Sequence, residues 1–562
     1  MPSTTEIKTN FTAGEVSRAL LGRGDLRAYE NGALTLRNVF IQPTGGVTRR
    51  AGLRHIDTLD GDGRLVAFEF NTEQTYLLVL TAGKIRIYAG ETPVATLSAP
   101  WTGDQIPQVA WTQSADTLLL VHPDVSPRRL LRGAGGTFSL QEWVFFAEGA
   151  RVRQPYYKFA DAAATLTPGA TTGNVTLTAS APVFTPEHEN TRLRVGGKQV
   201  LVTDYDSPTV VSATVLETLS GTSATIDWEE QAFSPARGYP ATVAFHQDRL
   251  VIGGSRDLPN RLWFSRSGDL FNFDLGTGLD DEAIEFAVLS DQVNAIRGLF
   301  SGRHLQVFTS GAEWMVTGDP LTPKTVQLTR QTRVGTLTAR HVPPVSVDGA
   351  TLFVARNGRE MREFVYTDVE QAYQSVDLAL VSRHLIQSPI DQDFDPVRRL
   401  LFVVRADGSF LTLTVYRTES VAAWTRHETD GAVRSVALAG DAVYMAVERA
   451  GTYRLEKMDD GLFMDAALSG ENPAGASVWS GLAHLEGRSV RILADGLAVG
   501  PRTVQGGSVT LDAPAKEVQI GLPFTHIVEP LPPAGAGAAR RVRLVEATFR
   551  VESTQSLRVD FG

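Results

Sequence analysis

The acidic residues Asp391, Asp393 and Asp395 come nearest to the spacing of a chemical site. Carboxylates at alternate positions imitate the first three ligands of a calcium-binding loop. Such a loop also needs a glycine at its sharp turn and a glutamate at its end, and this chain has Pro396 and Phe402 there. The pattern therefore favours a solvated loop over a calcium site.

Two further groups of ionisable residues give equally weak signals. Glu187-His188-Glu189 follows Pro186 but lacks the spacing of a zinc-binding helix, so we interpret it as a solvated loop. Asp280-Asp281-Glu282 could supply paired carboxylates for glycoside hydrolysis, but sequence neighbours seldom reach the required separation on one face. We interpret this group as an acidic loop.

The usual catalytic motifs are missing from the sequence. It contains no phosphate-binding G-x-x-x-x-G-K-[ST], no G-x-S-x-G nucleophile turn and no cysteine. The aromatic and arginine-rich stretch at 261–273 could anchor an interface, but Trp263, Phe271 and Phe273 are better explained as core residues. We therefore expect a protein that is not an enzyme and that holds no metal or cofactor.

Length and composition indicate several β-rich units. The 562 residues exceed what one hydrophobic core normally serves, and 51 glycines with 28 prolines provide many turns. The N-terminal decapeptide has no apolar signal-peptide region, and no apolar run is long enough for a membrane span, so we expect no stable membrane insertion. A net charge of −10 offers no basic body for gripping nucleic acid, although DNA could pass without being held.

A short apolar strand between polar turns recurs along the chain. Its copies lie at 73–83, 115–122, 247–254, 302–311, 348–358, 397–408 and 440–451. Apart from one long gap, the spacing matches the period of a propeller blade, about 40–50 residues. The predicted fold is all-β: a β-propeller of about seven blade-like repeats, with an inserted small β domain and a C-terminal β module. A generic sandwich is the alternative.

Five regions follow from this pattern. Residues 1–56 form an N-terminal leader, and 57–157 form the first propeller blades. The long gap places a β-sandwich-like insertion at 158–235, before the remaining blades at 236–469. Residues 470–562 form the C-terminal module, in which a flexible break at 532–539 precedes a closing strand pair.

The leader carries two kinds of signal and a local charge of its own. Residues 14–39 have apolar side chains at helix-like spacings, and a Gly45-Gly46 turn then leads to Arg49 and Arg50. Eight Lys or Arg against four Asp or Glu make residues 1–56 basic on an acidic chain. Such a charge contrast suits a docking surface.

The leader resembles the N-termini of podovirus tail proteins of the nozzle, or tail tubular protein B, family. Stretches 237–273, 481–496 and 518–524 look like the same group. The leader positions that carry the resemblance are Ala13, Gly14, Glu15, Gly22, Arg23, Asp25, Leu26, Tyr29, Asn31, Gly32, Asn38, Pro43, Gly45, Gly46, Arg50 and Gly52.

The resemblance implies a structural role in the virion, after assembly in the bacterial host cytoplasm. Such proteins form a ring, usually a homohexamer, below the tail adaptor protein; it offers attachment surfaces for tail fibres or tail-tip proteins. Genomic double-stranded DNA passes through the channel without sequence-specific binding, and an acidic wall would help it slide. The alternatives are a glycan-binding or glycan-cleaving propeller protein, and a tail hub or stabilisation protein.

On this hypothesis, Gly45, Gly46, Arg49 and Arg50 are the expected contacts with a neighbouring subunit or with the adaptor. The alternative is a clasp that holds the leader on its own propeller.

Overall fold

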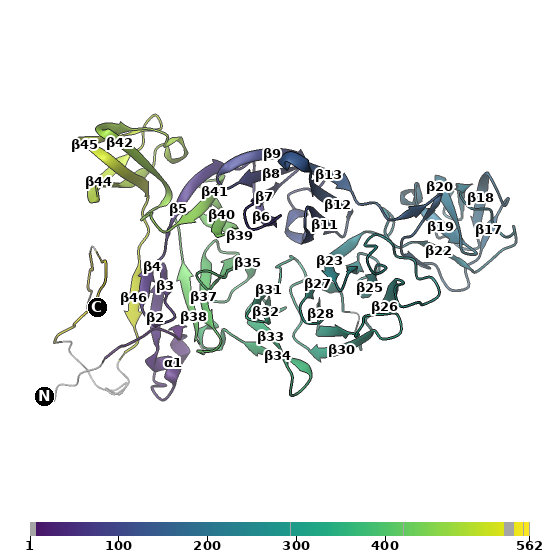
Figure 1. Ribbon diagram of the computed structural model, residues 1–562, viewed down its shortest axis with the longest axis horizontal. Helices are drawn as coiled ribbons and strands as arrows, with labels where there is room; N and C mark the ends of the chain where they lie inside the picture. Colours follow the sequence, from purple (N-terminus) through teal and green to yellow (C-terminus); the bar gives the residue numbers. More distant parts are fainter. Residues whose placement is uncertain (1–6, 293, 420, 533–544, 555, 561–562) are drawn as a thin grey trace.

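The structure is a computed structural model that describes residues 7–292, 294–419, 421–532, 545–554 and 556–560. Most of the described chain is strand, arranged as a ring of small sheets with one module on each side (Figure 1). The helical content is one turn, α1 (Arg27–Glu30), and short 3-10 turns at Arg18–Leu20, Ile106–Gln108, Ala134–Gly136, Pro186–His188, Leu380–Ser382 and Ala483–Leu485.

Seven antiparallel four-stranded blades form the ring, which confirms the predicted propeller. Blade one is β6 (Arg64–Glu69), β7 (Thr75–Thr81), β8 (Lys84–Ala89) and β9 (Thr92–Ser98). Blade two is β10 (Ala110–Ser114), β11 (Thr117–His122), β12 (Val125–Arg132) and β13 (Phe138–Glu142). Blade three is β23 (Pro240–His246), β24 (Arg249–Ser255), β25 (Arg261–Phe264) and β26 (Ile284–Ala287). Blade four is β27 (Ile296–Ser301), β28 (Leu305–Thr309), β29 (Glu313–Thr317) and β30 (Gln327–Thr332).

Blades five to seven complete the ring. Blade five is β31 (Val345–Val347), β32 (Ala350–Val354), β33 (Met361–Thr367) and β34 (Ala372–Asp377). Blade six is β35 (Pro389–Asp395), β36 (Leu400–Arg405), β37 (Phe410–Tyr416) and β38 (Val421–His427). Blade seven joins β39 (Ala432–Ala439), β40 (Ala442–Arg449) and β41 (Thr452–Asp459) to β5 (Gly52–Thr58) from the leader. One strand from the start of the chain therefore closes the ring.

Each of the seven runs found in the sequence coincides with the second strand of a blade to within one residue at its end. These strands are buried almost throughout, because both of their edges are paired and both of their faces pack against neighbouring blades. Each pair of consecutive blades shares a buried apolar cluster, and blades seven and one share theirs through Leu65, Leu77, Tyr444 and Leu455. The hydrophobic core is thus a closed chain of interblade layers.

A seven-stranded sheet lies between blades two and three, and it follows the hairpin β14 (Ala147–Glu148) and β15 (Arg151–Val152). A bridge between Leu166 and Thr225 brings the two ends of the sheet close together. The expected sandwich is therefore a single curled sheet around its own core. Its strands are β16 (Tyr156–Tyr157), β17 (Leu166–Pro168), β18 (Asn174–Ala179), β19 (Arg192–Val195), β20 (Lys198–Ser207), β21 (Val210–Val215) and β22 (Trp228–Gln231).

The leader extends blade six instead of forming a helix. In the stretch with helix-like spacings only α1 and the 3-10 turn at Arg18–Leu20 are helical, which corrects that expectation. Two leader strands run parallel to β38, where pairing with an existing strand outweighs the local helical preference. The leader strands ahead of β5 are β1 (Gly14–Glu15), β2 (Gly32–Arg37), β3 (Val39–Ile41) and β4 (Val47–Arg49).

The C-terminal module continues the sheet of blade seven around its own apolar core. Its strands are β42 (Asp465–Trp479), β43 (Ser489–Ala494), β44 (Leu497–Thr503) and β45 (Val509–Leu522), and β46 (Ile527–Pro530) then returns to pair with β2. The expected closing strand pair is absent from residues 545–554 and 556–560, which hold no strand. The predicted break at 532–539 lies outside the described residues except for Pro532.

Candidate functional site at the leader clasp

The three aspartates that resemble a calcium loop lie along β35, an inner blade strand, so the solvated-loop interpretation is wrong. The carboxylates of Asp391 and Asp393 accept hydrogen bonds from β39 of the next blade, at Val436 N (3.2 Å) and Leu438 N (2.7 Å). Asp395 instead binds Arg398 and nearby backbone N–H groups. These carboxylates hold blades and turns together.

The other two acidic groups also have structural partners. His188 is buried rather than solvated, with Nε2 3.0 Å from a Glu230 carboxylate oxygen, which corrects the loop interpretation. The Glu282 carboxylate accepts three backbone N–H bonds from residues 277–279 at 2.6–2.7 Å, and Asp281 pairs with Arg266. Across the described ranges, no cluster of three or more His, Cys, Asp or Glu could hold a metal ion.

The aromatic stretch at 261–273 belongs to the core. Trp263 and Phe273 are buried between blades two and three, and Phe271 packs against the same cluster. The aromatic side chains that could have anchored an interface are therefore packed inside this chain.

Arg50 is the centre of a polar site that we call the leader clasp: Asn38, Arg49 and Arg50 with their partners Asp465 and Phe524. The Arg50 guanidinium is fully buried and binds both carboxylate oxygens of Asp465 at 2.8 and 2.6 Å. Its Nε donates to Asn38 Oδ1 at 3.2 Å, and its plane lies 3.6 Å from the Phe524 ring centroid. One side chain thus joins the leader to the start and the end of the C-terminal module.

Asn38 completes the clasp in the left-handed backbone region, with φ of 57°. Its Oδ1 also accepts from Glu428 N at 2.8 Å, and its Nδ2 donates to Thr525 O at 2.9 Å. Asparagine tolerates this conformation better than most residues do, and here its amide oxygen accepts and its amide nitrogen donates hydrogen bonds.

Arg49 caps backbone carbonyls at the turn that leads into the C-terminal module. Its guanidinium donates to Leu462 O at 2.7 Å and to Asp460 O at 2.9 Å, and it lies over Phe463. Both arginines therefore act within their own chain. The Arg50 guanidinium is fully buried within its own chain, and the contact of this segment with a second copy stays a prediction.

The Gly45-Gly46 turn packs on one side and is open on the other. Gly45 is buried with φ of +97°, and a Cβ there would lie 2.2 Å from Cβ of Asn10. Gly46 is exposed, with open space around its Cβ position. Among the four predicted contact residues, Gly46 is exposed and Arg49 is half-buried; a contact of either with a neighbour stays a prediction.

Two histidines near Arg50 are held neutral. Burial, reinforced by the positive charge of Arg50, lowers the pKa of His427 far below its usual range. Burial and the charges of Arg50 and Arg49 lower the pKa of His526 to about 4. At neutral pH the charges at the centre of the clasp are therefore those of Arg50 and Asp465, which balance.

The arrangement is suited to holding modules in fixed positions. Gly14, another residue of the leader pattern, has φ of +70°, and a Cβ there would lie 2.3 Å from Trp424 N on β38. Gly14, Asn38 and Arg50 of the leader pattern thus lie where the leader is joined to the rest of the chain. None of the helices that the structure describes is long and apolar enough to cross a membrane.

The fold defines a seven-bladed β-propeller with two added β modules. No family model and no curated protein sequence matches the chain. Similar solved structures include BamB from Moraxella catarrhalis, with 12% identity, 72% of this chain and 98% of that chain covered, and a TM-score of 0.35. The Pan2 WD40 domain from Neurospora crassa is 7% identical, and the match covers 73% of this chain and 94% of that domain, with a TM-score of 0.33. YCF48 bound to D1 peptide is 10% identical, and the match covers 72% of this chain and 94% of that chain, with a TM-score of 0.34. The propeller assignment rests on the blade topology itself.

Proposed function

We propose that this chain is a structural protein of a short-tailed phage virion, the subunit of the tail nozzle ring. The observation that carries the proposal is the role of the leader residues that resemble the nozzle family. Gly14, Asn38, Gly45 and Arg50 occupy positions where this fold needs those residue types. A pattern that encodes the junction of leader, propeller and C-terminal module supports a shared architecture.

A rigid junction suits a part that must transmit DNA under pressure. Buried ion pairs and close backbone packing hold the modules in one arrangement, so that a ring of copies would keep its channel open. The net charge of −10 suits a wall along which phosphates slide without being held. In this role the protein binds its own copies, the tail adaptor and fibre or tip proteins, and it performs no catalysis.

The test is assembly on the adaptor. The purified full-length chain is mixed with the adaptor ring from the same phage and imaged by electron microscopy, with its solution mass measured in parallel. We expect a ring, alone or on the adaptor, with DNA ejection lost when the chain is omitted from tail assembly. A stable monomer that ignores the adaptor and binds or cleaves oligosaccharide would overturn the proposal in favour of a glycan-directed propeller.

A further inference from the structure

Residues 545–552 have the pattern of a strand but lie outside every sheet. Val545, Ala547, Phe549 and Val551 alternate with polar or charged residues, so a strand here would gather all four on one face. Yet Val545 is 90% exposed, Phe549 51% and Val551 56%. The segment therefore offers an apolar strand face that the described chain leaves unpaired.

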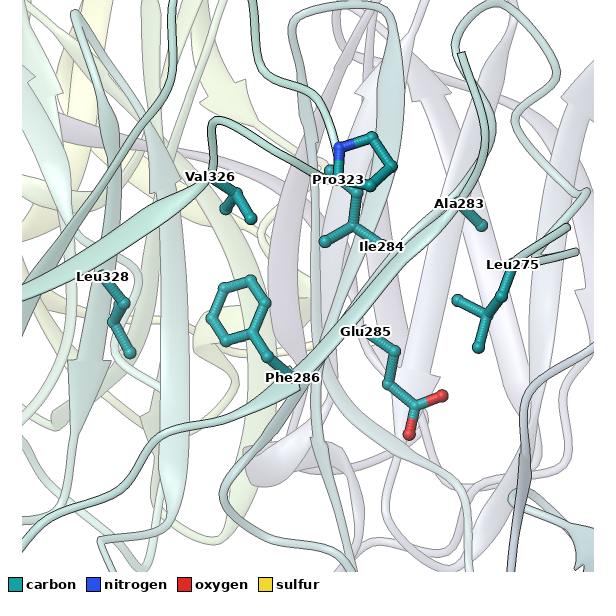
Figure 2. Close-up of a pocket in the computed structure, with 8 residues that line it drawn as sticks. All are labelled: Leu275, Ala283, Ile284, Glu285, Phe286, Pro323, Val326 and Leu328. Atoms are coloured by element: carbon teal, nitrogen blue, oxygen red, sulfur yellow. The ribbon is translucent and has the colours of Figure 1, made fainter. Parts of the chain in front are cut away.

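A groove on the propeller, lined mainly by apolar residue types, offers a surface for such a face. It lies between the outer strands of blades three and four and has a volume of about 400 Å³. Glu285 is the only charged residue of its lining (Figure 2), which consists of Leu275, Ala283, Ile284, Glu285, Phe286, Pro323, Val326 and Leu328. On one side of it is β26, the end strand of its sheet, so one edge of β26 pairs with no strand among the described residues and could accept another strand.

The two surfaces lie on opposite sides of the propeller. Figure 1, in which the longest axis is horizontal, places residues 545–554 and 556–560 at the left near β46, whereas β26 and β30 lie toward the right. Most of the propeller's width separates the described segment from the groove of its own chain. A second copy is the partner that would bring an equivalent segment to this groove.

We propose that residues 545–552 of one copy add as a strand to β26 of the next copy, with Phe549 and Val551 in the groove. Strand addition takes affinity from main-chain hydrogen bonds and specificity from pockets for alternate side chains. A donor and an acceptor on opposite sides of one chain make a head-to-tail contact, which closes into a ring when the rotation allows. The inference rests on the self-association assumed in the proposed function, and it identifies the contact.

Cysteine cross-linking tests the contact directly, because the natural chain has no cysteine. One preparation carries Phe549→Cys and a second carries Leu328→Cys, so that a mixed disulfide can form only between copies. Matched controls place the second cysteine on other free sheet edges, at Val94 of β9 or Leu497 of β44, both exposed apolar residues. We expect the linked pair with Leu328→Cys at least ~10-fold more than with either control. Preferential linking to Leu497→Cys or Val94→Cys, or no linking at all, would overturn the inference.

Assembly measurements separate this inference from the nozzle proposal. Phe549→Asp with Val551→Asp should weaken self-association of the full chain at least ~10-fold in sedimentation velocity, because two apolar side chains lose their groove. The control, Thr548→Asp with Ser556→Asp, adds the same charge on polar positions and should change association less than ~2-fold. Rings of unchanged strength in the first variant would overturn strand addition and leave the ring standing. A 549–328 cross-link in an open oligomer would support strand addition and count against the nozzle.

Discussion

Arg50 shows why residue type matters at a module junction. A planar guanidinium can bind both oxygens of Asp465, reach Asn38 through Nε and stack on Phe524 at once, and a lysine ammonium cannot. Both charges are withdrawn from water, so each depends on the other for its stabilisation. The sequence indicated a basic, turn-rich leader, but it could not show that the partner lies 415 residues further along the chain.

Replacing Arg50 by alanine should lower the free energy of unfolding by about 3–5 kcal/mol, because the Asp465 carboxylate stays buried without its cation. Arg50→Lys should recover only part of this loss, since it cannot bind bidentately. Denaturant unfolding measures both effects. The control is Arg23→Ala, whose pair with Asp25 is exposed, so that its loss should leave the stability nearly unchanged. Normal stability of Arg50→Ala combined with lost rings would restore the subunit-contact hypothesis.

Asp393 predicts a pH dependence of stability. Burial raises the pKa of its carboxyl to about 7, whereas an unfolded aspartate titrates near pH ~4. The folded chain therefore holds a proton that the unfolded chain releases, and the free energy of unfolding should fall as pH rises from ~4 through ~7. Asp393→Asn keeps an acceptor for Leu438 N–H but cannot ionise, so it should flatten this slope.

Urea unfolding at pH 5, 6, 7 and 8 measures that slope. Asp25→Asn serves as the control, because Asp25 is exposed and its Arg23 partner lowers its pKa to about 2, below the tested window. An equal slope in Asp393→Asn and in the natural chain would contradict the assignment.

At the scale of elements, β5 is the strand that closes the propeller. It pairs with β41 and closes blade seven, while Leu53 lies in the core shared by blades six and seven. The runs of the second strands were visible in the sequence because a strand buried on both faces is apolar throughout. The leader strands were hidden, because β2 is only half buried and finds its partner β38 only in the folded chain.

Leu53→Ala should therefore destabilise the propeller, and Leu193→Ala should not. Both leucines are fully buried, but Leu193 belongs to the separate core of the inserted sheet. Each substitution should lower the stability of its own unit by about 2–5 kcal/mol. Hydrogen exchange with mass spectrometry locates the effect: faster exchange in β41 and β40 for Leu53→Ala, and within 156–231 alone for Leu193→Ala. Equal effects of both variants on blade seven would show that insert and propeller unfold as one unit.

At the scale of the whole molecule, the propeller is a closed body that carries its modules at two sites. The inserted sheet and the C-terminal module have their own apolar clusters, whereas the blades share theirs around the ring. An exposed strand pattern on one side and an apolar groove on the other make the chain directional. Direction of this kind lets identical copies form a head-to-tail assembly.

The sequence alone determined the all-β class, the number of repeats and the position of the interruption, because these depend on the local spacing of apolar runs and turns. Only the tertiary structure decided which strand closes the ring, that Arg50 is a buried clasp, and that Asp391 and Asp393 join neighbouring blades. Those features depend on contacts between residues tens to hundreds of positions apart, and a spacing pattern carries no information about such pairs.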